Sequence, residues 1–387
     1  MPQQITIFDV YNNGQFGGVS PSTQLGTPWV FGGLKSSGGG GAKRGVQQLV
    51  HNYDEIISLE NLCLAWEEFL VGKKQKNDVQ NFELALMDNI LSLHADLASG
   101  QYQHGGYESF FINDPKRRHI HKASVRDRLL HHAVYRLLYP FFDRTFIADS
   151  YSCREEKGTH KAINRFRSFA NKVGKNNTRT CWVLKGDIRK FFASIDHSVL
   201  KKILAEYISD KKILFLLSNI IDSYETELGS SVGLPLGNLT SQLFSNIYLN
   251  RFDQFVKHQL KEGYFIRYAD DFVILSDNKE KLINLLPLLE NFLGGELKLH
   301  LHPDKIFLKT ISSGVDFLGW TLFSDYRTIR AVTKQRMFRR IQDNSSPASL
   351  QSYLGLLSHG NTYKIRQKLL NDYWLWGDEM IDSNYTN

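Results

Sequence analysis

The sequence predicts an α+β protein in which helices surround short buried strands that carry acidic residues. Apolar residues recur at helical spacing between residues 53 and 97, and again after residue 330. Short apolar, β-rich runs occupy residues 180–188 and 265–275, and each run contains aspartate. Helix-like and strand-like runs within one chain together define this class.

The composition is that of a globular chain with a basic balance. The 387 residues are 42% hydrophobic, which is enough for a sizeable core and two or three packed units, and the net charge is +7. A positive balance is compatible with a polyanionic partner.

No apolar run reaches the length of about 18 residues that a membrane span needs, and residues 1–4 lack a secretory pattern. The three widely spaced cysteines favour a reducing compartment over a disulfide framework. We therefore expect a cytoplasmic protein with no membrane partner.

Residues 1–50 differ in composition from the rest of the chain. Glycine, serine, threonine and asparagine dominate, and four consecutive glycines occupy positions 38–41. Such a stretch cannot bury enough apolar area to offset the entropy lost on ordering. We expect a flexible N-terminal extension.

Residues 110–120 predict two strands joined by a basic turn. Lys116 and Arg118 alternate with Arg117, so their side chains should share one face of the second strand. Two cations on one face suit a triphosphate, although an ordinary charged hairpin edge is the alternative. Further along, cations are interleaved with aromatic residues, a pattern that predicts a nucleic-acid track. The residues are Arg144, Arg154, Lys157, Lys161, Arg165 and Arg167, with Tyr151, Phe166 and Phe169.

Acidic residues mark the ends of two predicted strands. Asp187 ends the run 180–188, where a carboxylate is costly unless it is paired, hydrated or bound to a metal. Asp270 and Asp271 lie at the turn of a predicted hairpin, and strand alternation places only one of them squarely in a site. Simple capping of the hairpin is the alternative. If the strands pair in one sheet, the carboxylates converge into a site for Mg²⁺ ions, which support phosphoryl transfer.

Between these strands, residues 233–242 form a glycine-rich stretch that leads into a helix, with Asn238 or Thr240 as the cap. Its glycines would let the backbone approach a nucleotide closely, and a plain loop is the alternative. The remaining pattern predicts several further elements. They are a helix over 280–293, a strand over 297–302, a turn at 302–305, a β element over 314–320 and a basic helical unit over 330–376.

Taken in order, these motifs resemble those of reverse transcriptases. The matching motifs are Lys116-x-Arg118, Asp187 in Gly-Asp-Ile-Arg-Lys-Phe-Phe, the Gly237-x-x-x-Ser241 turn, Tyr268-Ala269-Asp270-Asp271, His302-Pro303-Asp304-Lys305 and Phe317-Leu318-Gly319-Trp320. The resemblance spans residues 55–378. It implies a right-hand polymerase fold, with fingers and an antiparallel palm sheet over 51–325 and a helical thumb and tail over 326–387.

The resemblance also implies a role for each matched residue. Asp187, Asp270 and Asp271 would be the catalytic acids and, together with Ile188, would bind two Mg²⁺ ions, for which Mn²⁺ can substitute. Phe192 would be a steric gate that favours dNTPs over rNTPs. The nucleotide-binding set would be Lys116, Arg118, Phe192, Gly237, Gln242 and Lys305, with Lys305 a candidate general acid toward pyrophosphate. The primer grip would consist of Phe317, Leu318, Gly319 and Trp320. The partners would then be an RNA template, a DNA or RNA primer, and dNTPs.

Within the family, the run 236–242 is similar to reverse transcriptases of diversity-generating retroelements. Ser241-Gln242 stands where mobile group II intron enzymes generally carry Ser-Pro. The segments 149–154, 157–161 and 352–355 share this resemblance. Such enzymes copy a template-repeat RNA into cDNA, misincorporate mainly at adenines, and are usually assisted by a small basic accessory protein.

Three other bacterial reverse transcriptases remain as alternatives: a retron enzyme, a phage-defence enzyme and a group II intron-like enzyme. A different class of protein, a non-catalytic nucleic-acid binder on a polymerase scaffold, is disfavoured by the three clustered acids, because carboxylates repel a phosphate backbone. An RNA-dependent RNA polymerase is disfavoured by Phe192 and by Tyr268-Ala269 before the acids.

Overall fold

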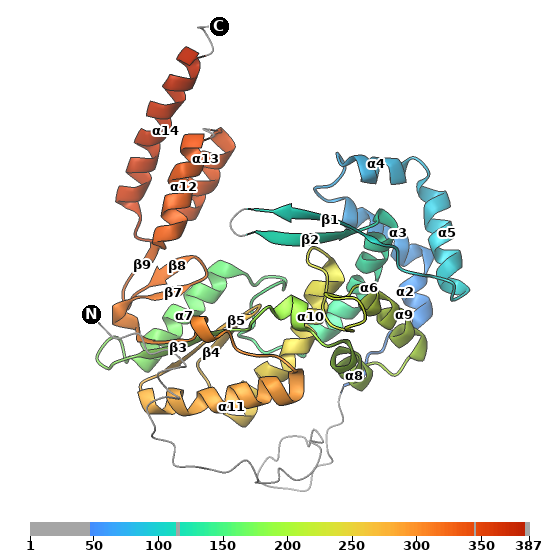
Figure 1. The fold of residues 1–387 in the computed structure, drawn as a ribbon, viewed down its shortest axis with the longest axis horizontal. Coiled ribbons are helices and arrows are strands. Elements are labelled where there is room, and N and C mark those ends of the chain that lie inside the picture. Colours follow the sequence, from blue (N-terminus) through green and yellow to red (C-terminus); the bar gives the residue numbers. More distant parts are fainter. Residues whose placement is uncertain (1–46, 114–116, 344–345, 384–387) are drawn as a thin grey trace.

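The structure, a computed structural model, describes residues 47–113, 117–343 and 346–383 (Figure 1). The flexible extension predicted over residues 1–50 lies outside these ranges except for its last four residues, and Lys116 also lies outside them. Helices surround a central antiparallel sheet, which confirms the predicted α+β class.

The N-terminal part is a group of helices with one projecting hairpin. Its elements are α2 (Tyr53–Ile57), α3 (Leu59–Leu70), α4 (Asn77–Glu83), α5 (Leu86–Ala98), β1 (Tyr107–Ile112), β2 (Arg118–Ala123) and α6 (Val125–Asp143). Ser58 and Ser124 cap α3 and α6, each by accepting a hydrogen bond from a backbone N–H of the first turn. The strands β1 and β2 pair antiparallel, which confirms the hairpin predicted there. In Figure 1 this hairpin reaches from the helices toward the C-terminal end of the chain.

The central part contains a four-stranded sheet in the order β4-β5-β3-β6, with every neighbouring pair antiparallel. Its elements are α7 (Thr159–Val173), β3 (Trp182–Asp187), η1 (Phe191–Ser194), α8 (His197–Tyr207), α9 (Lys211–Asp222), α10 (Leu239–Gln254), η2 (Phe255–Gln259), β4 (Phe265–Tyr268), β5 (Asp271–Ser276), α11 (Lys279–Leu297), η3 (Pro303–Lys305) and β6 (Phe307–Thr310).

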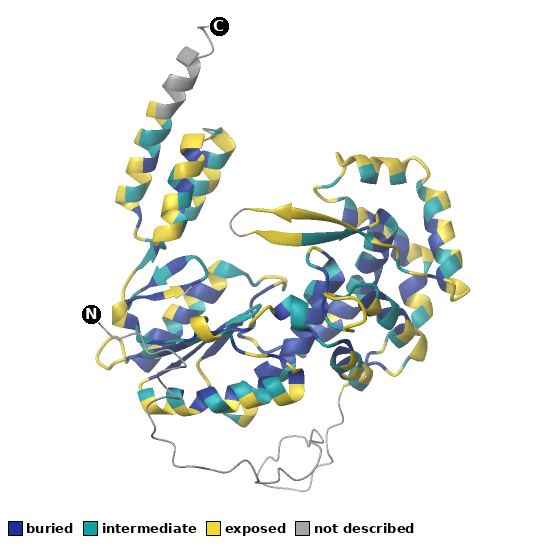
Figure 2. Cartoon of the chain, viewed as in Figure 1, coloured by how far each residue is buried: buried dark blue, intermediate teal, exposed yellow. Residues whose placement is uncertain are grey.

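Both faces of this sheet are covered, which explains why its strands are almost continuously apolar. On one face, Val183, Ile266 and Val273 pack with the apolar side of α7. On the other face, Leu184 and Phe272 belong to the main core with α10 and α11. Figure 2 shows buried residues along this sheet and on the helices around it, as well as within the N-terminal helices. The sheet is therefore a rigid support for residues at its ends.

The C-terminal part begins with a small sheet and ends in three helices. Its elements are η4 (Ile311–Ser313), β7 (Val315–Phe317), β8 (Trp320–Leu322), β9 (Arg327–Ile329), α12 (Ala331–Asp343), α13 (Pro347–Leu357) and α14 (Tyr363–Ser383). The helices share a small core of their own, which includes Met337, Ile341 and Leu369. In Figure 1 they stand apart from the central sheet, joined to it through β7, β8 and β9. The predicted helical unit after residue 330 is confirmed.

One predicted strand is wrong. Residues 297–302 alternate between apolar and polar residues, but α11 continues to Leu297, and of these residues only Leu301 makes a β-bridge, to Ile188. Leu297, Leu299 and Leu301 are all buried. The alternation therefore reflects burial of every second side chain in a segment that pairs with the end of β3 at this one bridge, where the Arg189 N–H donates to the His300 carbonyl at 2.9 Å and the His302 N–H donates to the Asp187 carbonyl at 2.8 Å.

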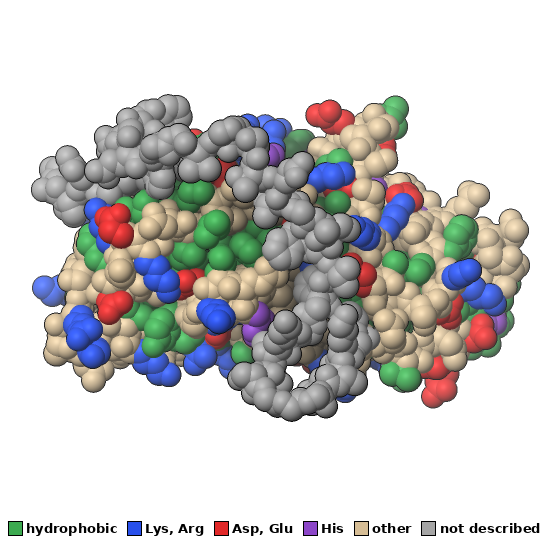
Figure 3. Space-filling model, turned by 90° about the horizontal axis from the view of Figure 1, so that it is seen from below, with side chains coloured by type: hydrophobic (Ala, Val, Ile, Leu, Met, Phe, Trp, Pro, Cys, Tyr) green, Lys and Arg blue, Asp and Glu red, His purple; other side chains and the backbone are tan. Residues whose placement is uncertain are grey.

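The surface charges do not form one continuous patch on the underside of the molecule. Where side chains are visible in Figure 3, lysine and arginine residues are scattered among acidic ones.

Within the described ranges, none of the helices combines the length and apolar content needed to cross a bilayer.

Candidate active site at the acidic end of the central sheet

The fold brings the three predicted acids together at one end of the sheet. Strand β3 pairs with β5 so that Asp187 lies directly opposite Asp271, and opposite residues of an antiparallel pair point to the same face. Asp270 lies next to them in the turn between β4 and β5. The Ile188 backbone N–H donates to the Asp270 carbonyl at 3.2 Å, which ties this turn to the end of β3. The predicted convergence of the two acidic strand ends is confirmed.

Charge and burial both act on these carboxyl groups. Burial, reinforced by the nearby charges of Asp187 and Asp271, raises the pKa of Asp270 to about 6. Burial also raises the pKa of Asp271, and the Lys185 ammonium, whose Nζ lies 3.5 Å from Asp271 Oδ1, opposes that shift. The Lys305 Nζ, placed by η3, donates to Asp187 Oδ1 at 2.7 Å. The site therefore concentrates negative charge that two lysines only partly balance.

The donor set at this site consists of oxygen atoms, which suits a hard cation such as Mg²⁺ better than a soft metal. In the described part of the chain, no three His, Cys, Asp or Glu side chains are gathered closely enough to form a ready metal centre. Instead, Asp187 and Asp271 each face a lysine. Burial, together with the neighbouring carboxylates Asp187 and Asp271, raises the pKa of Asp270, and a cation at this position would offset both effects.

A buried arginine, Arg267, is hydrogen-bonded to the turn that carries Asp270, and the sequence patterns did not identify it. The Arg267 guanidinium on β4 is 1% exposed and binds both oxygens of Asp253 on α10, at 2.6 and 2.7 Å. It also donates to the Ala269 carbonyl at 3.1 Å, inside the turn that carries Asp270. The sequence did contain one indication of this ion pair: Arg267 follows the apolar residues Phe265 and Ile266 in a predicted strand, and a charge buried in such a strand needs a partner.

A glycine turn contacts the projecting hairpin. Gly237 has φ +110°, and a Cβ atom there would lie 2.9 Å from the Ile120 Cγ2 atom of β2. The His121 N–H donates to the Leu236 carbonyl at 3.0 Å, and the Asn238 side-chain amide donates to the His121 carbonyl at 2.8 Å. Asn238 stands at the N-cap position of α10, as one of the two predicted caps, but its side chain is used for this contact.

Two further residues of the predicted nucleotide-binding set lie beside this turn. The Phe192 carbonyl accepts a hydrogen bond from the Leu234 N–H at 2.8 Å, and the Phe192 ring is half-buried. Gln242 is half-buried near the start of α10. The structure thus brings Gly237 against the strand that begins at Arg118, with Phe192 bonded to the loop that contains Gly237 and Gln242 following that loop in the chain, while Lys116 lies outside the described residues.

The segment predicted as a primer grip forms the turn between β7 and β8. Leu318 and Gly319 both have positive φ, at 49° and 86°, and occupy the turn itself. Phe317 and Trp320 are buried in the core that includes α7. The Lys185 Nζ, beside the acids, donates to the backbone carbonyl of β7 at 3.2 Å. The turn is therefore anchored close to the acidic end of the sheet.

The predicted nucleic-acid track is wrong in its aromatic part. Tyr151, Phe166 and Phe169 are buried in the core under the sheet, so their rings cannot stack on bases. Arg154 and Arg165 pair with carboxylates, at 2.6 and 2.8 Å. The recurring aromatic residues are therefore core residues. Phe166 and Phe169 lie on the buried face of α7, and Tyr151 lies in the segment before that helix.

Comparison with known proteins assigns the family. Residues 113–322, more than half of the chain, match the family model described as "Reverse transcriptase (RNA-dependent DNA polymerase)". The chain is 29% identical to "Protein YkfC" of Escherichia coli (strain K12) over 282 residues, which cover 62% of this chain and 74% of that protein. It is 24% identical to the "Group II intron-encoded protein LtrA" of Lactococcus lactis subsp. cremoris over 320 residues, which cover 64% of this chain and 51% of that protein.

A solved structure of apo telomerase from Candida tropicalis, truncated from the C-terminal domain, aligns with 63% of this chain and 60% of its own, with a TM-score of 0.44 and 15% identity. The family match covers the acids, the glycine turn and the hairpin's second strand. The chain therefore belongs to the reverse transcriptase family, as an RNA-directed DNA polymerase of mixed helix and antiparallel-sheet architecture.

Proposed function

We propose that this reverse transcriptase copies a template-repeat RNA into cDNA at the acidic end of the central sheet, as the polymerase of a diversity-generating retroelement. The convergence of Asp187, Asp270 and Asp271 carries the catalytic part of the proposal. The resemblance of Ser241-Gln242 and of the segments 149–154, 157–161 and 352–355 carries the retroelement part.

The acids would hold two Mg²⁺ ions, or Mn²⁺ as a substitute, with Ile188 contributing at the end of β3. Such ions activate the primer 3′-hydroxyl and neutralise charge on the departing pyrophosphate. Lys305, whose Nζ lies 2.7 Å from Asp187 Oδ1, would donate a proton to that leaving group.

The half-buried Phe192 ring, fixed beside the glycine turn, would exclude a ribose 2′-hydroxyl and so select dNTPs. Arg118 and Lys116 would bind the triphosphate, and Gly237 would let the backbone approach the nucleotide. The turn at Leu318 and Gly319 would contact a DNA or RNA primer, with Phe317 and Trp320 as its buried support. A small basic accessory protein would complete the assembly.

Gln242 is the residue proposed to lower fidelity. Its amide would offer alternative hydrogen bonds beside the nascent base pair and so relax the fit of wrong nucleotides. Gln242→Pro, and Gln242→Ala as a variant that keeps the backbone N–H, should reduce errors at template adenines. The measurement is deep sequencing of cDNA from one RNA template. An unchanged error spectrum in both variants would refute this role.

Primer extension on an RNA template tests the whole proposal. Purified protein with Mg²⁺ and dNTPs should synthesise DNA, rNTPs should be poor substrates, and an Asp270→Ala/Asp271→Ala variant should be inactive. Errors clustered at template adenines would support the retroelement assignment. Faithful synthesis would favour the second candidate, a group II intron-like or related bacterial enzyme, which the resemblance to an intron-encoded protein supports. No synthesis, even with a partner protein and native RNA, would overturn the polymerase assignment for these acids.

A further inference from the structure

A cavity lies where the central and C-terminal parts of the chain meet, and we call it the junction cavity. It has a volume of about 240 Å³ and is lined by α7, the turn between β8 and β9, and the loop between α13 and α14. The Asn361 N–H donates to the Arg327 carbonyl at 2.9 Å, and the Arg327 guanidinium donates to the His359 carbonyl. Three segments far apart in sequence are thus tied together around one cavity, and its described lining does not include the acids of the active site.

Two guanidinium groups line the junction cavity, that of Arg167 on α7 and that of Arg327 on β9. Arg167 Nη2 donates to the Asp325 carbonyl at 3.2 Å, and Arg327 Nη1 donates to Asn164 Oδ1 at 3.1 Å. Within the described ranges, neither guanidinium forms an ion pair with a carboxylate. Burial, together with the charge of Arg167, lowers the pKa of Arg327. An anion bound beside both groups would offset burial and repulsion alike.

The carboxylate among the described lining residues is that of Asp325. Its Oδ1 atom accepts a hydrogen bond from Asn177 Nδ2 at 2.6 Å, so it is bound to a neutral amide. Two guanidinium groups against one carboxylate leave the lining with a net positive charge.

The rest of the lining is largely apolar and contains flat rings. Ile163, Phe166 and Leu322 contribute apolar side chains. The Phe323 and Tyr326 rings are stacked, with centroids 4.6 Å apart and planes 15° apart, and Tyr326 is 47% exposed. A ligand that joins a phosphate to a flat ring would therefore use both the cations and the rings.

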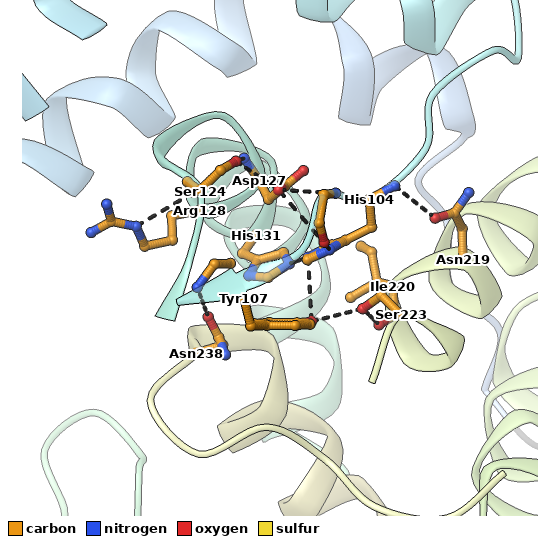
Figure 4. A network of polar contacts seen from close by, with 12 residues as sticks. His104, Tyr107, Ser124, Asp127, Arg128, His131, Asn219, Ile220, Ser223 and Asn238 are labelled. Atoms are coloured by element: carbon orange, nitrogen blue, oxygen red, sulfur yellow. Dashed lines mark hydrogen bonds and ion pairs between the residues drawn. The ribbon is translucent and has the colours of Figure 1, made fainter. Parts of the chain in front are cut away.

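A second polar cluster, at the base of the projecting hairpin, differs because it is closed (Figure 4). His104 Nε2 lies 3.1 Å from His131 Nε2. The Asp127 carboxylate accepts hydrogen bonds from the hydroxyls of Tyr102 and Ser124 at 2.7 and 2.6 Å. His131 and Asp127 are both buried. This cluster therefore supports the fold, whereas the guanidinium groups of the junction cavity are left without a counterion.

We propose that the junction cavity binds a nucleoside monophosphate, with its phosphate on Arg167 and Arg327 and its base against the Tyr326 ring. Arginine forks onto phosphate oxygens, and a base stacks on an aromatic face. The volume is below the range of about 300–1,000 Å³ that is usual for ligand sites, so the cavity encloses the phosphate end of one nucleotide and leaves the base on the exposed ring. This site is additional to the acidic site and does not depend on the proposed retroelement role.

The test is isothermal titration calorimetry of the full chain with adenosine 5′-monophosphate (AMP), in phosphate-free buffer with EDTA. Wild type should bind AMP more tightly than inorganic phosphate, because only AMP has a base, and Tyr326→Ala should remove this difference. Arg167→Gln should weaken AMP binding about tenfold, the scale of one charge-assisted hydrogen bond. Asp325→Asn should tighten AMP binding about threefold, because it removes the negative charge and keeps an oxygen for Asn177.

Arg144→Gln is the matched control. Arg144 is an exposed arginine at the end of α6 and does not line the junction cavity, so its loss should leave AMP binding unchanged. The Asp270→Ala/Asp271→Ala variant should also bind AMP like wild type, which separates the junction cavity from the acidic site. Thermal unfolding of each variant would verify that the fold is intact.

Absence of AMP binding in wild type would overturn the proposal, as would equal AMP affinities of wild type and Arg167→Gln. Equal affinities of wild type for AMP and inorganic phosphate would assign the cavity to a bare anion and reject the nucleotide. A 5′-phosphorylated RNA hexamer that binds more tightly than AMP, with the same loss in Arg167→Gln, would place a strand there and also overturn it. Primer extension is measured separately, and DNA synthesis without AMP binding would reject the junction site while leaving the proposed function in place.

Discussion

The buried ion pair beneath the acidic turn provides the sharpest test of how the fold positions the acids. We predict that Arg267→Met destabilises the protein and abolishes DNA synthesis, although Arg267 lies within the β4 core and not at the site surface. Its guanidinium is 1% exposed and its partner Asp253 is fully buried. The same guanidinium donates to Ser150, Asn246 and the Ala269 carbonyl.

The magnitude follows from what the substitution leaves behind. Arg267→Met would strand the Asp253 carboxylate in the core, and removal of one partner of a buried pair costs about 3–5 kcal/mol. The Ala269 carbonyl also loses a hydrogen bond. Ala269 has φ 53°, a left-handed conformation that costs a non-glycine residue about 1–2 kcal/mol. Without Arg267, the turn that carries Asp270 would relax.

A double variant separates stability from positioning. Arg267→Met/Asp253→Leu removes both charges, and apolar replacement of a whole buried pair is often close to neutral. We expect it to recover most of the lost unfolding free energy while DNA synthesis stays at least about tenfold below wild type, since one misplaced catalytic group costs at least that much. Denaturant unfolding followed by fluorescence gives the first quantity, and primer-extension rate gives the second.

Two results would refute this reasoning. A loss of less than about 1 kcal/mol in Arg267→Met would show that the pair is not effectively buried. Full activity in the double variant would show that the acidic turn keeps its conformation without the hydrogen bond from Arg267.

Two further predictions concern the acids and the glycine turn. Between pH 3.8 and about 6, folded Asp270 holds a proton that the unfolded chain has released, so this group's contribution to stability falls as pH rises through that window. Asp270→Asn should therefore raise the thermal midpoint in metal-free buffer at pH 8 while abolishing synthesis, and a lowered midpoint would contradict this. Gly237→Ala would place a Cβ atom 2.9 Å from Ile120 at φ +110°, and we expect a cost of about 1–3 kcal/mol and a higher KM for dNTPs. Gly263→Ala, where the added atom meets nothing within 4 Å, should change neither unfolding nor KM; equal effects of the two would reject this explanation.

Local sequence was sufficient for most of the fold and for the position of the acids. The hairpin at 265–276 and the helix before residue 98 follow from periodicity and turn chemistry, which depend on neighbours a few residues apart. The acids sit at strand ends, where a carboxylate within an apolar run indicates a site. The ordered set of motifs was enough to identify the family, because its combination is far more specific than any one of its parts.

Tertiary structure decided what each side chain meets. Arg267 and Asp253 lie on a strand and a helix, and nothing in either local pattern pairs them. Phe166 and Phe169 alternate with cations as an RNA-binding surface would, yet α7 turns them into the core beneath the sheet. Phe111 continues an apolar strand pattern, yet it is exposed on a projecting hairpin. In each case the side chain, an arginine or a phenylalanine, could serve either in the core or at a binding surface. Only the packing of distant segments, which sets burial and partners, determines which of the two it serves.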